Sequence, residues 1–341
     1  MNSSEPVGTI GALWRFPVKS MLGEELDAAE LGEGGIAGDR AYAIVDRQTG
    51  KVASAKHPKQ WPNLLECRAA FVEEPRAGEE PPAARIELAD GASVLSDAPD
   101  VDAVLSRFFG REVELARAAQ NGYTIDQYHP DEEDYDPEGH RDEVVEARLG
   151  AAFFNDRGLP SAVPEGSFFD LFPLSVLTTS TLDHLGELEP ESRFDARRFR
   201  MNVIVETAQA GFAENEWVGR TVALGDDVRI SVALPDPRCV MPSLAQKDLP
   251  RDPRILKALR GRRGDGHDPQ GRQRQRGLRN AARRPSTSTP AAHAAARRFR
   301  RGLADAAADA ARCIAPRIWV DLGRQSRRER TRVRRVSRGQ S

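Results

Sequence analysis

Cysteine, histidine and long apolar runs are scarce in this sequence. Its 341 residues include only three cysteines (Cys67, Cys239 and Cys313) and six histidines. Three cysteines this far apart exclude a disulfide framework and a paired-cysteine zinc site. No apolar run reaches the roughly 18 residues of a membrane helix, and the first residues lack the apolar core of a signal peptide. We therefore expect a soluble, cytoplasmic protein with no membrane segment.

Lysine, tyrosine and methionine are absent from residues 261–341. This stretch holds 22 arginines against six acidic residues, a net charge of +16, whereas the 28 basic and 46 acidic residues of 1–260 give −18. Such a composition is typical of a disordered basic tail, and it is also what a GC-rich gene yields when it is translated out of frame. The acidic body argues against specific nucleic-acid binding.

The first third of the chain has the pattern of strands and turns. Short apolar runs such as "GTIGALWRF" and "AYAIVD" are bounded by Gly, Pro and Asp. The Asp-Gly pair in "ADGA" predicts a hairpin turn. One helix is predicted in "DAPDVDAVLSRFFG", where apolar residues share a face and Gly110 ends the helix. The acidic stretch 119–150 lacks periodicity and predicts a connecting loop.

A second folded segment follows this stretch. "FFDLFPLSVLTTSTLDHLGEL" predicts a strand and then a short helix, and "WVGRTVALGDDVRISVALPD" predicts two strands joined at "GDD". We therefore predict a mainly β fold with α decoration, with two β-barrel-like domains and a disordered Arg/Ala-rich tail. The predicted parts are a barrel domain over 1–118, an acidic connection over 119–150, a second barrel domain over 151–260 and the tail over 261–341.

Basic residues gather at the ends of three predicted strands. "FPVKS" contains Lys19 and Ser20, "GIAGDRAY" contains Arg40, and "RRFRMN" contains Arg200 and Asn202. Ammonium, hydroxyl and guanidinium groups hold phosphates and other oxyanions. Their concentration in an acidic body indicates an anionic ligand, although an arginine taken alone is more often part of a surface ion pair.

Cys239 lies in "PDPRCVMP", directly after Arg238 in a loop bounded by prolines. A neighbouring cation favours the thiolate over the thiol, and a nucleophile, a persulfide carrier or a soft-metal ligand requires a thiolate. No histidine is an obvious partner, which weakens a Cys–His hydrolase and leaves metal ligation or sulfur transfer. Cys67, inside "LLECRAAF", is expected to be a small buried apolar residue.

Five ordered motifs resemble the MOSC family, in which an N-terminal MOSC β-barrel domain precedes a MOSC (molybdenum cofactor sulfurase C-terminal) domain. They are "FPVKS", "GDRAYAIVD", "FDARRFRMNVIVE", "FAENEWVGRTVALGD", and "PRCVM" followed by "LPRDPRIL". The chain looks similar to bacterial MOSC proteins and to the mitochondrial amidoxime-reducing component. The resemblance implies a bound molybdenum–pterin cofactor.

The resemblance also implies roles for individual residues. Cys239 matches the cysteine whose sulfur ligates molybdenum, and Arg238 would help to keep it ionised. The residues that match cofactor contacts are Lys19, Ser20, Arg40, Thr178, Thr179, Arg200 and Asn202. The implied reaction is oxygen removal from a small N-hydroxylated or N-oxide substrate. Because no iron–sulfur cysteine motif occurs, the electrons would come from an external donor protein.

The sequence departs from the family at its end. The family closes its MOSC domain with a segment of the type "G-x-Y-A…G-x-V-x-x-G-D-x-V", and here the arginine-rich stretch begins where that segment should be. An unclosed barrel leaves unpaired backbone. Two alternatives to an oxidoreductase stay open: a sulfur carrier with a persulfide on Cys239, and an inactive truncated MOSC protein whose basic tail binds acidic surfaces without specificity.

Overall fold

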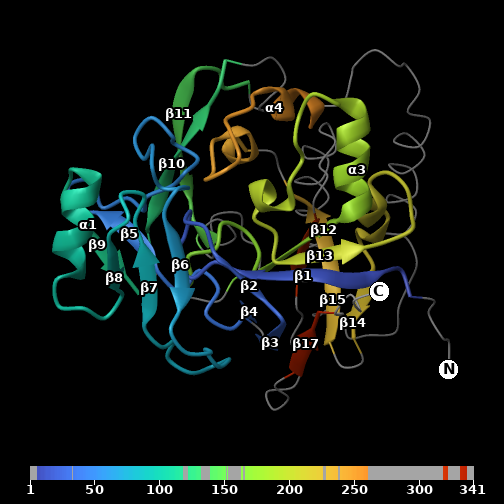
Figure 1. The fold of residues 1–341 in the computed structure, drawn as a ribbon, viewed down its shortest axis with the longest axis horizontal. Coiled ribbons are helices and arrows are strands. Elements are labelled where there is room, and N and C mark those ends of the chain that lie inside the picture. The colour runs from blue at the N-terminus through green and yellow to red at the C-terminus, as the bar shows by residue number, and fades with distance from the viewer. Residues whose placement is uncertain are drawn as a thin grey trace, which may run out of the picture.

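The computed structural model describes eleven parts of the chain. Its regular secondary structure is mainly strand, with a few helices, as the sequence predicts (Figure 1). No helix in these parts is long and apolar enough to cross a membrane. The described residues are 6–32, 34–117, 122–131, 139–150, 152, 163, 166–225, 228–236, 239–259, 318–321 and 331–335.

Seven strands form the largest sheet, and their bounds are β1 Thr9–Arg15, β2 Glu24–Leu26, β12 Leu174–Thr178, β13 Val203–Glu206, β14 Thr221–Leu224, β15 Val228–Pro235 and β16 Ile318–Asp321. Their order is β14-β15-β16-β12-β13-β1-β2. β1 pairs antiparallel with β13, with Leu13 opposite Val203, and β12 pairs parallel with β13. The start of the chain thus lies in one sheet with strands from its second half (Figure 1).

The remaining strands form four smaller sheets. Their bounds are β3 Ala28–Gly32, β4 Gly35–Ile36, β5 Ala43–Asp46, β6 Arg68–Phe71, β7 Ala84–Glu87, β8 Ser93–Leu95, β9 Val113–Ala116, β10 Thr124–His129, β11 Glu143–Arg148 and β17 Thr331–Arg334. The pairings are β5 with β9, β10 with β11, β6-β7-β8, and β17-β3-β4. The predicted "ADGA" turn is confirmed between β7 and β8, where Gly91 has a φ of 90°.

The helices are few and short. They are α1 Val101–Phe109, α3 Thr179–Leu188, α4 Arg254–Ala258 and the 3-10 turns η1 Ala196–Phe199, η2 Ala213–Trp217 and η3 Met241–Ser243. The predicted first helix is confirmed as α1, which ends at Gly110 in the left-handed conformation. This residue type fits because glycine has no Cβ to clash there. The predicted second helix is confirmed as α3.

Apolar side chains cover both faces of the large sheet, because successive residues of a strand point to opposite sides. Val176 and Val203 belong to a core with residues of β3 and β17. Their neighbours Leu177 and Ile204 pack instead with residues of α3 and α4. Figure 1 shows α3 and α4 on one side of β12 and β13. A separate core joins β6 to β8 and α1.

The expectation of a loop over residues 119–150 is wrong where β10 and β11 form an antiparallel pair from Thr124↔Arg148 to His129↔Glu143. In β10, Ile125 is buried while several neighbours stay partly exposed. An antiparallel pair can expose one face to water. The charged residues on that face give this segment the composition of a loop, so the sequence does not reveal the strands.

Two short segments of the predicted tail are strands. β16 lies between β15 and β12, and β17 pairs with β3, where Val333 is buried. The expectation of a disordered tail is therefore wrong at these two places. Residues 261–317, 322–330 and 336–341 lie outside the described residues.

Candidate functional site

Three of the predicted site residues share an uncommon backbone conformation. Ser20, Arg40 and Arg200 have φ values of 65°, 50° and 56°. Among the described residues other than glycine, only Asp142 and Lys247 also have a positive φ. A side chain in this region is strained, and such strain concentrates at functional sites. The three residues follow β1, β4 and η1, so strand and helix ends set their positions.

Lys19 is a buried cation at the centre of the site. Its Nζ donates to the carbonyl oxygen of Phe168 at 2.9 Å and to Oδ1 of Asp170 at 2.7 Å. The other carboxylate oxygen of Asp170 lies 3.4 Å from Nζ of Lys56. Burial lowers the pKa of Lys19 to about 8, with Asp170 opposing and Lys56 adding to the shift. Although burial opposes it, the two lysines hold the pKa of Asp170 below its ordinary value.

Two arginines meet over one aromatic ring. The guanidinium carbons of Arg40 and Arg200 lie 4.6 and 4.4 Å from the ring centroid of Phe16, within the range of a cation–π contact. Nη2 of Arg40 donates to the carbonyl oxygen of Arg200 at 3.4 Å, and Nη1 of Arg200 donates to the carbonyl oxygen of Met21. Burial, followed by the charge of Arg40, lowers the pKa of Arg200 to about 9.

A buried polar network fixes Arg40 in place. Asp39 accepts from the backbone N–H of Phe16 at 2.7 Å, from Nδ2 of Asn202 at 2.8 Å and from Arg40 itself. Asn202 in turn accepts at Oδ1 from Oγ of Ser175 at 2.9 Å. Asn202, predicted as a cofactor contact, is thus placed beneath the cationic groups with its amide bonded within the protein.

Ser20 and Cys239 border the same cluster. Oγ of Ser20 accepts from the backbone N–H of Ala55 at 3.1 Å, next to Lys56 in sequence. Cys239 is half-buried. Although burial opposes it, Asp170 and then Cys239 raise the pKa of Lys56, and Cys239 is also among the groups that oppose the lowered pKa of Arg200. The thiol is therefore within electrostatic range of two cations. Arg238, predicted to support its ionisation, lies outside the described residues.

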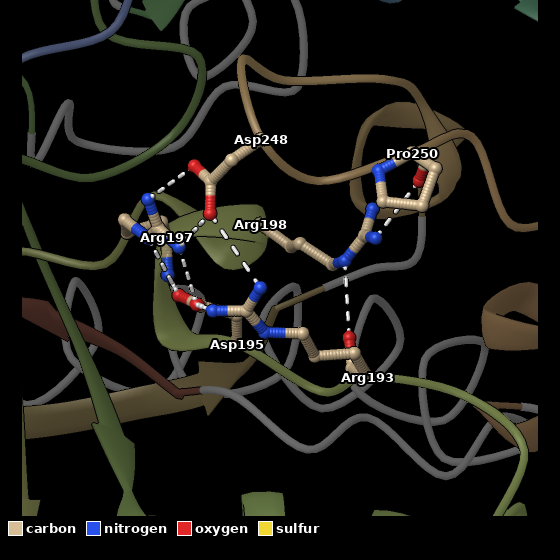
Figure 2. A network of polar contacts seen from close by, with 6 residues as sticks. All are labelled: Arg193, Asp195, Arg197, Arg198, Asp248 and Pro250. Carbon is tan, nitrogen blue, oxygen red and sulfur yellow. Dashed lines mark hydrogen bonds and ion pairs between the residues drawn. The ribbon is translucent and has the colours of Figure 1, made fainter.

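The segment after Cys239 is anchored by Arg198 (Figure 2). This buried guanidinium donates to the carbonyl oxygens of Pro242 and Leu244, both at 3.2 Å, and of Pro250 at 2.9 Å. Its neighbour Arg197 instead pairs with Asp195 and Asp248 at 2.7 and 2.8 Å, as Figure 2 shows. Of the "RRFR" arginines, only Arg200 therefore joins the cationic cluster.

The two predicted threonines lie at the start of α3. Thr178 is buried, accepts from the backbone N–H of Thr181 at 3.3 Å and donates to Oε2 of Glu214 at 2.6 Å. Its hydroxyl thus serves as a helix cap. Thr179 is half-buried at the first residue of the helix. Desolvation raises the pKa of Glu214 to about 7, against the opposing hydrogen bonds from the hydroxyls of Thr178 and Thr181.

Sequence reasoning missed Lys56, Asp170 and Asp39. Asp170 is a lone acid inside the apolar run "FFDLFPL", and an acid in such a run needs a cation when the run is buried. Lys56 follows the buried run "VASA" in the same way that Lys19 follows "FPV". Cys67 is buried as predicted, and desolvation raises its pKa to about 11.

The cluster suits an anionic ligand that also carries a soft metal. Ammonium and guanidinium groups converge where an oxyanion could bind, and a thiol lies within range of two of them. No candidate residue lines the cavity of about 460 Å³ beside η2, which is bounded by Gln209, Ala210, Phe212, Ala213, Asn215 and Glu216. Among the described residues, no cluster of three or more His, Cys, Asp or Glu side chains is arranged to hold a metal by itself.

Two family models match the chain. The MOSC N-terminal beta barrel domain matches residues 7–109, and the MOSC domain matches residues 165–279. The first match contains Lys19 and Arg40, and the second contains Arg200 and Cys239. No curated protein matches the sequence.

Proposed function

The chain belongs to the MOSC domain-containing proteins, and from this premise we propose that it is a molybdenum-cofactor-dependent oxidoreductase. MOSC domains are associated with binding of the molybdenum cofactor. The proposed substrate is a small N-hydroxylated or N-oxide compound, and the proposed electron source is a separate donor protein. The proposed location is the cytoplasm.

The observation that carries the proposal is that Cys239 lies near two cations of the cluster. Lys56 and Arg200 lie within electrostatic range of the thiol. Lys19 and Arg40 belong to the same cluster through Asp170 and Arg200. A pterin phosphate is an oxyanion that such groups hold, and molybdenum is a metal for which a thiolate is a suitable ligand.

The residues of the chain would divide the work of binding. Lys19, Ser20, Arg40 and Arg200 would hold the anionic and polar parts of the cofactor, while Cys239 would ligate its metal. When bound, the cofactor supplies a two-electron centre for removing oxygen from an N–O group. Phe16 orients the two guanidinium groups, and Asp39 holds Arg40.

Cofactor content is the test. The full chain would be purified from a molybdenum-replete host, and its metal and pterin would be measured for the wild type, Cys239→Ala and the control Cys67→Ala. We expect near-stoichiometric molybdenum in the wild type and the control, and its loss in Cys239→Ala. Equal molybdenum in the wild type and Cys239→Ala would overturn the assigned ligand.

A sulfur carrier remains the second candidate, because the half-buried Cys239 beside cations also suits a persulfide. A folded wild type without molybdenum but with cyanide-labile sulfur would favour it. A folded chain with neither metal nor labile sulfur would favour an inactive member of the family.

A further inference from the structure

The carboxylate of Asp170 lies between two lysines and pairs with both. Its two carboxylate oxygens are 2.7 Å from Nζ of Lys19 and 3.4 Å from Nζ of Lys56. A carboxylate that bridges two ammonium groups occupies the position that a phosphate oxygen would take in an oxyanion site. This arrangement pairs the buried Lys19 and the partly buried Lys56, whose charges would otherwise carry a desolvation cost.

The cluster of described residues contains nearly equal numbers of positive and negative side chains. Four cationic side chains face three carboxylates and the thiol of Cys239; the charged residues are Lys19, Lys56, Arg40, Arg200, Asp39, Asp170 and Asp236. A phosphate group that carries close to two negative charges would add uncompensated charge to this low-dielectric site. The departure of one internal anion would therefore favour binding of such a group.

The three carboxylates differ in how easily they could leave. Asp39 has a side chain that is 0% exposed and is bonded to a backbone N–H, Asn202 and Arg40. Asp236 is 8% exposed. The side chain of Asp170 is 30% exposed, and its partner Lys56 is 17% exposed. Asp170 is thus the carboxylate on the solvent side of the cluster.

From this geometry we infer that Asp170 is an internal counter-anion that a phosphate-bearing ligand displaces from Lys19 and Lys56, which makes Lys56 a further ligand-binding residue. The inference rests on the proposed function for the identity of the ligand, a cofactor phosphate. Asp170 stabilises the lysines while the site is free, and it then competes with the ligand for them. It therefore tunes the affinity of the site.

Inorganic phosphate is the probe for this inference. Calorimetric titration at low ionic strength would use the full chain, prepared without cofactor, as wild type, Asp170→Asn and Asp170→Glu. We expect Asp170→Asn to bind phosphate about tenfold more tightly, equivalent to roughly 1.4 kcal/mol, because the neutral amide no longer competes. Asp170→Glu keeps the charge and should bind about as the wild type does. Unchanged or weaker binding by a folded Asp170→Asn would overturn the inference.

Variants of Lys56 provide a second, independent test of the inference. Lys56→Gln should weaken phosphate binding about tenfold, and Lys56→Arg should largely restore it. If Asp170→Asn does not fold, as judged by circular dichroism, this pair decides: equal phosphate affinity in Lys56→Gln and wild type would refute the inference.

Phosphate binding and molybdenum content separate this inference from the proposed function. Predicted phosphate affinities in a chain that never acquires molybdenum would support the counter-anion and reject the oxidoreductase. Normal molybdenum content together with weaker phosphate binding by Asp170→Asn would support the oxidoreductase and reject the counter-anion.

Discussion

Glu214 should make the stability of this fold depend on pH. Its side chain is fully buried beneath α3, and the hydroxyls of Thr178 and Thr181 donate to it at 2.6 and 2.7 Å. Those hydrogen bonds favour the carboxylate, but the desolvation that opposes them is larger, so the pKa is raised from 4.5 to about 7. The folded chain therefore keeps this carboxyl protonated at pH values where the unfolded chain ionises it.

The magnitude follows from the difference between the two pKa values. Below about pH 4.5, Glu214 is protonated in both states, and its contribution to stability is fully present. As the pH rises towards 7, only the unfolded state loses the proton, so the free energy of unfolding falls. Above the folded pKa the loss is complete, at roughly 3 kcal/mol. Between pH 5 and pH 8 the expected loss is roughly 2.5 kcal/mol.

Urea unfolding at pH 5 and pH 8 tests this expectation. Glu214→Gln keeps the shape of the side chain but cannot ionise, so its stability should fall by roughly 2.5 kcal/mol less than that of the wild type between the two pH values. Comparing the two proteins cancels the titration of all other groups. Glu216→Gln, on the exposed side of η2, serves as the surface control and should behave as the wild type. The same pH dependence in wild type and Glu214→Gln would refute the reasoning.

Three further substitutions, the first with Arg197→Met as its control, test the packing around the site by urea unfolding. Arg198→Met removes the hydrogen bonds of a buried guanidinium to backbone carbonyl groups and should cost roughly 3 kcal/mol. Arg197→Met, which breaks partly exposed ion pairs, should cost less than about 1 kcal/mol; equal losses would contradict the anchoring role. Asn202→Ala should cost roughly 2 kcal/mol, because Asp39 and Ser175 lose their buried partner. Val333→Asp places a charge in the core between β17 and β3 and should cost roughly 3 kcal/mol; an unchanged midpoint would mean that β17 contributes nothing to the fold.

Local signals were sufficient for α1, α3, the β7–β8 turn and the β14–β15 hairpin. Gly110 ends α1 because the helix needs a left-handed residue there, and Thr178 begins α3 because its hydroxyl caps a free backbone N–H. The strands β14 and β15 follow from apolar runs on both sides of "GDD". These features depend on residues close in sequence, so they can be predicted from the sequence without knowledge of the fold.

Pairings between distant segments could not be predicted in the same way. The placement of β1 beside β13 depends on packing that no local pattern encodes. β10 and β11 were hidden because their exposed faces carry charged residues, which resemble a loop in composition. β16 and β17 come from an arginine-rich stretch without apolar periodicity, where sheet pairing outweighs intrinsic preference.

The site residues also fall into those that local motifs identify and those that only the fold brings together. Lys19, Ser20, Arg40 and Arg200 stand in ordered motifs, so the sequence could single them out. Whether Thr178, Thr179 and Asn202 contact a ligand stays a prediction, since the structure gives Thr178 and Asn202 internal partners. The pairing of Lys19 and Lys56 through Asp170 joins residues far apart in the chain. Only the folded arrangement shows that the two lysines share one counter-anion.

The backbone around the cluster favours a ligand-binding role over a purely structural one. A left-handed residue other than glycine costs roughly 1 kcal/mol, and Gly38, two residues before Arg40, shows that this chain uses glycine where such a conformation is needed. Ser20, Arg40 and Arg200 accept that cost and also bring polar groups into a buried site, where two guanidinium groups share one ring. Internal carboxylates already pair with the cations of this site, so an anionic ligand would bind there by replacing one of them, as we propose for Asp170.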